Sequence, residues 1–419
     1  MDVFRIYGGN ALKGAARIGC AKNAVLPILA AAMLTDEKII IRDCPRLVDI
    51  DNMLAILGML GCATNWDGNN VIVDAGSAHS WDMPEALSKK IRSSIFMLGP
   101  LIGRFRRACV TYPGGCDIGL RPIDLHLKGL RTLGVKIWEE HGRIHCDGTR
   151  LMGGEVYLDL PSVGATENVM MAAVLAQGAT YIHNAAREPE IVDLERFINA
   201  MGGKVRGAGT DCIVIEGVER LTGAEFTPVS DRIVAGTLMA ACAATRGEII
   251  LENAPVSALG APIDKLRSCG CEVEPQGDKI HMRAGGRLRP FDISTQCYPG
   301  FPTDLQAQFM ALACTIEGAS MIVENLFESR FGHAAQLMRM GADVYVSGRL
   351  AVVRGAKLTG TRVMACDLRG GAALVLAGLA AEGTTIVCGC EMIDRGYDGF
   401  EVMLGGMGAD IVRQSEAEA

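Results

Sequence analysis

The chain has 419 residues, of which 49% are hydrophobic and 21% charged, and its formal net charge is −7. This length exceeds what one hydrophobic core usually supports, so two domains are expected. The acidic balance argues against a nucleic-acid-binding protein, which needs a basic face against phosphates. No apolar stretch reaches the roughly 18 residues of a membrane span, and the first residues do not resemble a secretory signal. We therefore expect a cytoplasmic protein whose partners are neither nucleic acid nor membrane.

The chain contains 15 cysteines without the compact spacing of a disulfide framework. Reduced thiols are therefore expected. No CxxC pair indicates a zinc site. Two closely spaced pairs, Cys269 with Cys271 and Cys388 with Cys390, are interpreted as packing residues on strands.

A glycine that follows a hydrophobic helical stretch recurs six times, at intervals of 67 to 73 residues. The six positions are Gly61, Gly134, Gly202, Gly270, Gly341 and Gly408. Such a regular period is typical of an internal repeat. Each unit is predicted to run helix, strand, helix, strand, strand, with the glycine as the C-cap of the second helix.

The sixth unit lacks its last strand, because only a polar tail follows residues 408–413. The missing strand is predicted at the other end of the chain, where residues 3–8 match the endings of other units. Three repeats per domain then give an α/β protein with one domain at 22–229 and a second, discontinuous domain from 1–21 and 230–419. An open solenoid is the alternative, and the chain-closing N-terminal strand argues against it.

Residues suited to chemistry recur at two positions of the repeat. One position is the N-terminus of the first helix, which favours anions; it holds Lys22, Asn23, Arg92, Ser162, Val163, Gly164, Asp304 and Arg369. The other is the loop after the following strand, which holds Cys116, Arg187, Arg330 and Arg395. An arginine taken alone is as often a solvated charge or a structural ion pair, and Asp304 is equally suited to be a helix N-cap. Recurrence at equivalent positions favours one anion-binding cleft lined by both domains.

The segment from Pro113 to His126 combines glycines, a thiol, a cation and a carboxylate. Gly114, Gly115 and Gly119 allow a sharp bend or a moving lid. Cys116 has Arg121 nearby to stabilise a thiolate, while Asp117 opposes it. A single cysteine is most often a small buried hydrophobe, but this polar, glycine-flanked context favours chemistry.

The same segment resembles the active-site loop of the enolpyruvyl transferase family, in the branch that acts on UDP-N-acetylglucosamine. The resemblance continues through motifs from end to end of the chain: Gly19-Cys-Ala-Lys-Asn-Ala-Val-Leu-Pro27, Arg92-Ser-Ser94, Ser162-Val-Gly-Ala-Thr166, residues 184–193, residues 301–309, Asp367-Leu-Arg369 and Ile393-Asp-Arg-Gly-Tyr397. It implies two inside-out α/β barrels, with helices within and sheets outside, each built from three repeats.

The resemblance implies transfer of the enolpyruvyl group of phosphoenolpyruvate to the 3-hydroxyl of UDP-N-acetylglucosamine. Phosphate is released, in the first committed step of peptidoglycan synthesis. Neither a metal nor an organic cofactor is implied. Cys116 would protonate C3 of phosphoenolpyruvate and react with fosfomycin, and Asp304 would take the hydroxyl proton.

The remaining implied roles concern substrate binding. Lys22, Arg121 and Arg395 would hold the phosphate, with Lys22 and Arg395 also taking part in catalysis. Arg330 and Arg369 would hold the carboxylate, and Asn23 would orient the sugar. Further contacts to the UDP-sugar would come from Arg92, Arg121, Pro122, Ile123, Asp124, Leu125, Ser162, Val163, Gly164 and Leu326.

The chain departs from the family at Leu160, where many members carry lysine, and at Phe96, where many carry tryptophan. Some nucleotide contacts are therefore expected to differ. The nearest rival is the shikimate-pathway enolpyruvyl transferase, which lacks the cysteine loop. A non-catalytic sugar-nucleotide sensor is a second rival, and retention of Cys116, Asp304 and Lys22 argues against it. A monomer or weak homo-oligomer is expected.

Overall fold

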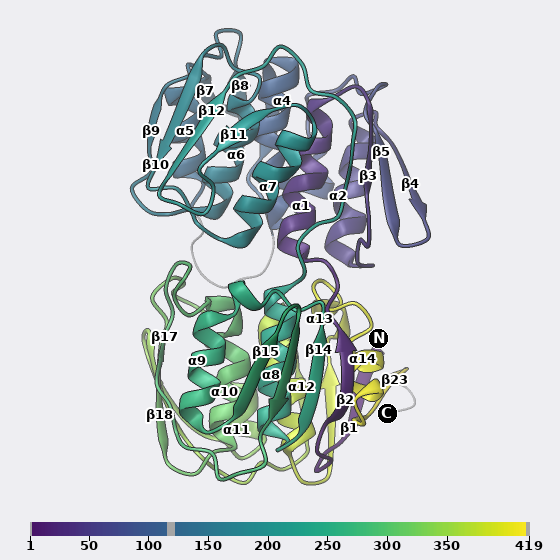
Figure 1. The fold of residues 1–419 in the computed structure, drawn as a ribbon, viewed down its shortest axis with the longest axis vertical. Helices are drawn as coiled ribbons and strands as arrows, with labels where there is room; N and C mark the ends of the chain where they lie inside the picture. The colour runs from purple at the N-terminus through teal and green to yellow at the C-terminus, as the bar shows by residue number, and fades with distance from the viewer. Residues whose placement is uncertain (1, 115–121, 416–419) are drawn as a thin grey trace. The chain divides into compact units, whose positions relative to one another are not determined.

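A computed structural model describes residues 2–114 and 122–415 of the chain. Those residues divide into two compact units (Figure 1). The continuous unit runs from Cys20 to Val229, and the discontinuous unit combines the residues up to Gly19 with those from Ser230 onward. Each unit is an α/β structure and is described by itself below. Gly115, Cys116, Asp117, Gly119 and Arg121 lie outside the described residues.

The continuous unit contains three repeats of helices and strands, joined by short linker strands. Its elements are α1 (Lys22–Ala31), η1 (Ala32–Leu34), β3 (Lys38–Ile41), α2 (Val48–Met59), β4 (Ala63–Asp67), β5 (Asn70–Asp74), α3 (Glu85–Ser88), η2 (Arg92–Met97), α4 (Leu98–Phe105), β6 (Arg107–Thr111), α5 (Asp124–Thr132), β7 (Lys136–Glu140), β8 (Arg143–Asp147), β9 (Glu155–Tyr157), α6 (Val163–Ala173), β10 (Ala179–His183), α7 (Pro189–Ala200), β11 (Lys204–Arg206), β12 (Cys212–Glu216) and β13 (Ala224–Phe226).

The discontinuous unit is built in the same way. Its elements are β1 (Asp2–Tyr7), β2 (Lys13–Arg17), α8 (Arg232–Ala244), β14 (Glu248–Glu252), η3 (Val256–Ala258), α9 (Gly260–Cys269), β15 (Glu272–Gln276), β16 (Lys279–Arg283), β17 (Ile293–Ser294), η4 (Thr303–Leu305), α10 (Gln306–Cys314), β18 (Ala319–Val323), α11 (Ala334–Arg339), β19 (Asp343–Ser347), β20 (Leu350–Arg354), β21 (Arg362–Met364), α12 (Leu368–Ala380), β22 (Thr384–Cys388), α13 (Cys390–Ile393), α14 (Phe400–Gly406) and β23 (Asp410–Ser415).

The six repeat glycines end the second helix of each unit, as predicted. All six have positive φ values, between 82° at Gly134 and 110° at Gly270. Glycine reaches this left-handed region without the steric cost that a Cβ adds. At Gly61 the cap is closed by the N–H of Cys62, which donates to the Leu57 carbonyl at 3.0 Å. The period of the sequence therefore reflects one helix-ending motif used six times.

The N-terminal strand completes the sixth repeat, which confirms the prediction. β1 lies between β22 and β23 and is antiparallel to both. β5, β12, β16 and β20 hold the same central place in their own sheets, each between two antiparallel partners. The chain thus uses its first residues to close its last sheet.

Short linker strands were not predicted, and they close each unit into a ring. Each leaves one repeat and adds in parallel to the sheet of another repeat in the same unit. In the discontinuous unit β17 adds to β18, β21 to β22, and β2 to β14. In the continuous unit β9 adds to β10 and β13 adds to β3. Because the third repeat returns to the first, neither unit is an open solenoid.

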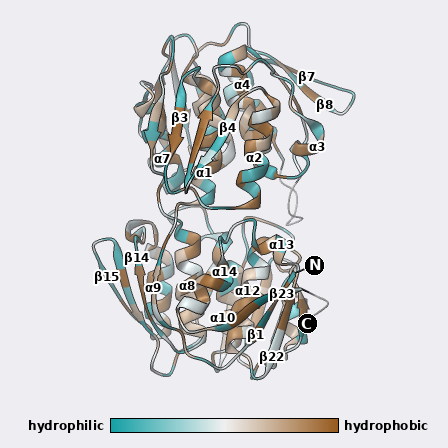
Figure 2. Cartoon of the chain, turned by 90° about the vertical axis from the view of Figure 1, so that its right-hand side faces the viewer, coloured by the Kyte–Doolittle hydropathy of each residue, from teal (hydrophilic) through white to brown (hydrophobic). Residues whose placement is uncertain are grey.

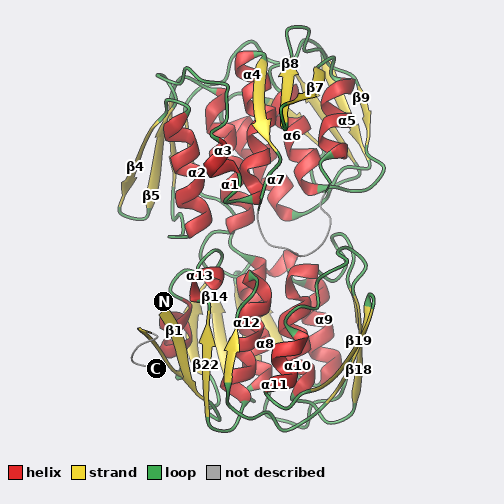
Figure 3. Ribbon diagram, turned by 180° about the vertical axis from the view of Figure 1, so that it is seen from behind, coloured by secondary structure: helices red, strands yellow, loops and turns green. Residues whose placement is uncertain are grey.

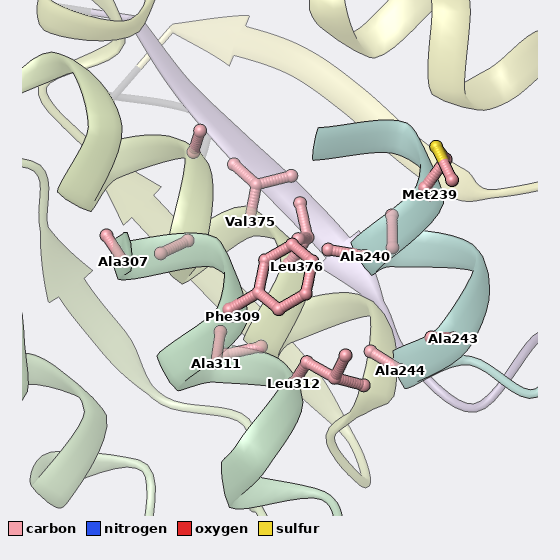
Figure 4. Close-up of a cluster of buried hydrophobic side chains, with 14 of the residues drawn as sticks. Met239, Ala240, Ala243, Ala244, Ala307, Phe309, Ala311, Leu312, Val375 and Leu376 are labelled. Atoms are coloured by element: carbon pink, nitrogen blue, oxygen red, sulfur yellow. The ribbon is translucent and has the colours of Figure 1, made fainter. Parts of the chain in front are cut away.

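The first helices of the repeats form the apolar centre of the discontinuous unit. α8, α10 and α12 pack against one another, and their residues are buried almost without exception. Figure 4 shows Phe309 and Leu312 of α10 beside alanines of α8 and the Val375–Leu376 pair of α12. A helix buried on all sides needs apolar residues all round, and small alanines let three such helices approach closely.

Sheets cover these helices, since α8 contacts β14 and β16, α10 contacts β18 and β20, and α12 contacts β1 and β22. Figure 3 shows the strands of this unit flanking the helices on more than one side. In the continuous unit Ile39 and Ile41 of β3 are buried in the hydrophobic core, and the strand is coloured brown over most of its length in Figure 2.

The cysteine pairs are buried, but of the four residues only Cys388 lies on a strand as predicted. Cys269 is the last residue of α9 and Cys271 follows the capping glycine. Cys388 ends β22, whereas Cys390 begins α13. In each pair a glycine with positive φ, Gly270 or Gly389, separates the two cysteines. Such a left-handed turn lets both cysteine side chains face the core without a strand.

Candidate active site

The chemical residues of the discontinuous unit gather where its buried helices begin. α8 starts after Asp231, whose Oδ1 accepts from the N–H groups of Ile233 and Val234 at 2.7 and 2.9 Å. α12 starts after Asp367, whose Oδ1 accepts from the N–H groups of Arg369 and Gly370, both at 3.0 Å. Aspartate is a favoured N-cap because its oxygens satisfy unpaired helical N–H groups. The sequence comparison of repeats missed Asp231 as a member of this set.

Asp304 is not the N-cap of η4 or of α10, so the N-cap interpretation of this residue is wrong. The cap positions of η4 and α10 are Pro302 and Leu305, neither of which makes a side-chain cap bond. One carboxylate oxygen of Asp304 accepts from Nη2 of Arg330 at 2.7 Å. The other accepts from Nη2 and Nε of Arg369 at 3.0 and 3.3 Å. Two predicted cations therefore meet on one predicted base.

Both guanidiniums are buried, since the side chains of Arg330 and Arg369 are only 6% and 4% exposed. They are therefore not solvated surface charges. Nη1 of Arg369 is buried and has no hydrogen-bond partner. Burial opposes the positive charge, but the carboxylates of Asp304 and Asp231 raise the pKa of Arg369 above its ordinary value. A buried donor without an acceptor favours binding of an anion.

His333 lies in the same region but does not add positive charge. Its ring is almost fully buried, and neither ring nitrogen has a hydrogen-bond partner. Burial, with a smaller effect from Arg330, lowers the pKa of His333 to about 4 despite the opposing effect of Asp367. The imidazole is thus neutral at pH 7, and the arginines supply the charge.

A buried carboxylate, Glu324, holds the neighbouring loops. It accepts from the hydroxyls of Thr295 and Thr303, both at 2.8 Å, and from the N–H of Leu326 at 2.9 Å. Thr303 precedes Asp304, and Leu326 is a predicted sugar contact. Glu324 therefore fixes two site segments to each other, although no sequence motif singled it out.

Arg395 follows α13 and is half-buried.

In the continuous unit Lys22 begins α1 and is paired with Asp49 of α2 at 3.1 Å. Both side chains are at most 10% exposed. The carboxylate of Asp49 thus offsets the charge of an ammonium placed at a helix N-terminus. Asp49 was not predicted, because an acid in the first turn of a helix is ordinarily explained by the helix dipole. Asn23 follows Lys22 and is half-buried.

Three predicted sugar-binding segments meet at the start of α6. Ser162 caps the helix, accepting from the N–H of Ala165 at 3.4 Å. Asn168 donates to the Ile95 carbonyl at 3.1 Å and to Nδ1 of His126 at 2.8 Å. A Cβ on Gly164 would lie 2.8 Å from Cε1 of His126 and 3.3 Å from Cε1 of Phe96.

Gly164 is therefore needed for the close approach of these rings. The arrangement joins the segment after Arg92, the segment after Pro122 to Leu125, and the helix that Ser162 and Val163 begin. Leu160 is 68% exposed beside this region. Cys116 and Arg121 belong to the part of the chain that the structure does not describe.

A buried acid, Glu167, lies one turn into α6. It is fully buried and neither carboxylate oxygen has a hydrogen-bond partner. Burial, followed by the charges of Glu190 and Glu188, raises the pKa of Glu167 well above its usual range. The buried environment therefore favours the neutral, protonated form of this carboxyl group.

Within residues 2–114 and 122–415, no three His, Cys, Asp or Glu side chains are grouped so as to hold a metal ion. No helix of the same residues combines the length and hydrophobicity that crossing a membrane requires.

The chain is similar to known proteins over nearly its whole length. Residues 6–404 match the family model described as EPSP synthase (3-phosphoshikimate 1-carboxyvinyltransferase). Two relatives named UDP-N-acetylglucosamine 1-carboxyvinyltransferase 2, from Caldanaerobacter subterraneus subsp. tengcongensis and Carboxydothermus hydrogenoformans, are 51% and 50% identical to the chain. Both alignments cover 99% of this chain and 100% of the relative.

Solved structures give the same class. The enolpyruvyl transferase NikO from Streptomyces tendae has a TM-score of 0.89 at 25% identity, and the alignment covers 99% of both chains. An EPSP synthase from Acinetobacter baumannii shares the fold, with a TM-score of 0.75 at 18% identity over 99% of this chain and 100% of the other. The fold and the site thus define an enolpyruvyl transferase.

Within that class, the chain belongs to the UDP-N-acetylglucosamine 1-carboxyvinyltransferase family.

Proposed function

We propose that the protein transfers the enolpyruvyl group of phosphoenolpyruvate to the 3-hydroxyl of UDP-N-acetylglucosamine and releases phosphate, as the first committed step of peptidoglycan synthesis. The observation that carries this proposal is the contact of Arg330 and Arg369 with Asp304. Two buried guanidiniums face one carboxylate, and the buried Nη1 of Arg369 has no acceptor of its own, which favours a small anion here.

Asp304 is engaged by both arginines in this state. A bound phosphoenolpyruvate carboxylate would compete for the same guanidinium donors. Each guanidinium donor that turned to the substrate would release one contact to the Asp304 carboxylate and free an oxygen to accept from the sugar hydroxyl. Substrate binding would in this way prepare the base that takes the 3-hydroxyl proton.

The other roles follow the motif matches. Lys22, Arg121 and Arg395 would hold the phosphate, and Cys116 would protonate C3 of phosphoenolpyruvate. The UDP-sugar would bind the segments gathered at the N-terminus of α6, with Asn23 and Leu326. This assignment requires both units to act on one pair of substrates, in two inside-out barrels at 22–229 and at 1–21 with 230–419. We further propose a cytoplasmic monomer or weak homo-oligomer that uses no metal or organic cofactor.

The direct test is phosphate release from phosphoenolpyruvate, measured with UDP-N-acetylglucosamine, with 3-phosphoshikimate and with neither. Release only with the UDP-sugar is expected. Release with 3-phosphoshikimate but not with the UDP-sugar would assign the protein to the shikimate-pathway branch of the family. No release with either acceptor would favour a binding protein.

A second test addresses Cys116. Cys116→Ser should abolish turnover while UDP-sugar binding survives, because a hydroxyl is a far weaker acid than a thiol. Mass mapping after fosfomycin treatment should find the adduct on this cysteine among the 15 thiols. A fully active Cys116→Ser enzyme, or an adduct only on other cysteines, would remove Cys116 from the mechanism.

A further inference from the structure

A hydrogen-bonded group of three polar side chains lies inside the apolar helical centre of the discontinuous unit. Its members are Thr237 of α8, Gln308 of α10 and Tyr397, which lies between α13 and α14. All three are at most 2% exposed. Buried polar groups cost stability unless they are satisfied, and an apolar replacement of similar shape is often neutral or better. Their presence among alanines and leucines therefore calls for a specific purpose.

The donor roles in this group can be assigned. The Thr237 hydroxyl lies 2.8 Å from the Ile233 carbonyl, which can only accept, so its one hydrogen is donated there. Oγ1 of Thr237 must then accept from the Tyr397 hydroxyl at 2.9 Å and from Nε2 of Gln308 at 3.1 Å. Nε2 donates its second hydrogen to Tyr397 at 3.0 Å. The tyrosine hydroxyl is held from two sides.

The held ring supports a site residue. The guanidinium carbon of Arg369 lies 5.6 Å from the centroid of the Tyr397 ring. The Tyr397 ring also packs against the Phe400 ring, with 4.5 Å between the two centroids. Arg369 in turn donates to Asp304 through Nη2 and Nε. The ring and the carboxylate together define where the guanidinium plane lies.

We propose that Thr237, Gln308 and Tyr397 are positioning residues that hold the Arg369 guanidinium in the orientation that binds phosphoenolpyruvate. The inference rests on the proposed function. The group joins α8, α10 and the segment after α13, which belong to three different repeats. One hydrogen-bonded network therefore fixes the positions of the three repeats relative to one another near Arg369. Apolar contacts would fix these positions with less directional precision.

The primary test is Tyr397→Phe, which removes one hydroxyl and keeps the ring. The KM for phosphoenolpyruvate is expected to rise about five- to tenfold, as for loss of one buried hydrogen bond, with kcat and the KM for UDP-N-acetylglucosamine changed less than twofold. Tyr345→Phe, at a tyrosine 66% exposed in the same unit, is the matched control and should change nothing. A lowered Tm with unchanged KM values would show a purely structural role and overturn the proposal.

A second pair of variants tests the same network if the tyrosine variant does not fold. Thr237→Val removes the acceptor and should raise the KM for phosphoenolpyruvate, whereas Thr237→Ser keeps the hydroxyl and should behave like the wild type. Equal effects of the two substitutions would contradict the proposal. In an Arg369→Lys background, Tyr397→Phe should add no further rise in KM, because the positioned group is absent; full additivity would also contradict it.

A structural readout separates this inference from the proposed function. In crystals, Arg369 of the Tyr397→Phe variant should lose its contact with Asp304, which the wild type keeps. Absence of phosphate release by the wild type would reject the reaction without touching this result. An unmoved Arg369 in an active enzyme would reject the network and leave the reaction standing.

Discussion

The starts of α12 and α6 differ in the charge of their buried polar side chains. At α12 and the neighbouring η4, two guanidiniums are buried against one carboxylate, and the local balance favours an anion. At α6 the capping and bridging side chains, Ser162 and Asn168, are uncharged, and burial raises the pKa of Glu167. The same repeat element therefore presents charged donors in one unit and uncharged hydrogen-bonding groups in the other.

The largest expected effect concerns the charged side chains at the starts of α12 and η4. Asp304→Asn removes the proposed base while keeping the shape of the side chain, so kcat should fall by about 10²- to 10⁴-fold. Steady-state phosphate release measures it. Asp343→Asn is the matched control, because Asp343 is exposed in an ion pair with Arg354 of the same unit. A loss of only a few-fold in the Asp304 variant would rule out the base assignment.

Arg369→Lys tests the geometry rather than the presence of the charge. Lysine keeps one positive charge but cannot make the paired contact through Nη2 and Nε. The KM for phosphoenolpyruvate should rise by roughly 10- to 100-fold, as expected for lost charge-assisted hydrogen bonds. Arg354→Lys, at an exposed position, should leave the KM unchanged. If Arg369→Lys binds phosphoenolpyruvate normally, the charge alone suffices and the fork is not needed.

Gly164→Ala tests the uncharged side chains at the start of α6. A Cβ 2.8 Å from the His126 ring would displace the ring and its bond to Asn168. Overpacking of this kind costs about 1–3 kcal/mol. We expect the KM for the UDP-sugar to rise about tenfold with that for phosphoenolpyruvate unchanged. Gly58→Ala in α2 places its Cβ in open space and is the control. Equal rises for both substrates would show that the two regions are not separable.

The smallest effect concerns pH and stability. Burial raises the pKa of Glu167 in the folded state, so the native state of the wild type loses stability as pH rises above the unfolded pKa of about 4.3. Glu167→Gln lacks this proton linkage. Its free energy of unfolding should match the wild type near about pH 4 and exceed it increasingly towards neutral pH. Urea unfolding at several pH values measures the difference, and a pH-independent difference would mean that Glu167 is ionised in the fold.

The repeat glycines and the β1 assignment were predictable because they depend on local rules. Positive φ at Gly61 or Gly408 is a property of a helix ending, and the alternation of residues 3–8 is a property of a strand. The linker strands escaped prediction because β17 and its relatives are only two to five residues long and are stabilised by a sheet of another repeat. Pattern within such a short segment carries no information about its partner.

Residue types and motifs by themselves determined the repeat, the α/β class, the family resemblance and the candidates Lys22, Asp304, Arg330 and Arg369. Only the tertiary structure decided that Asp304 pairs with two arginines rather than capping a helix, and that Asp49 and Glu324 belong to the site. It also decided that Thr237, Gln308 and Tyr397 form one group, although they come from three repeats. Helix and turn signals depend on neighbours in the chain, whereas the partner of a buried charge or hydroxyl is set by which segments the fold brings within about 3 Å of it.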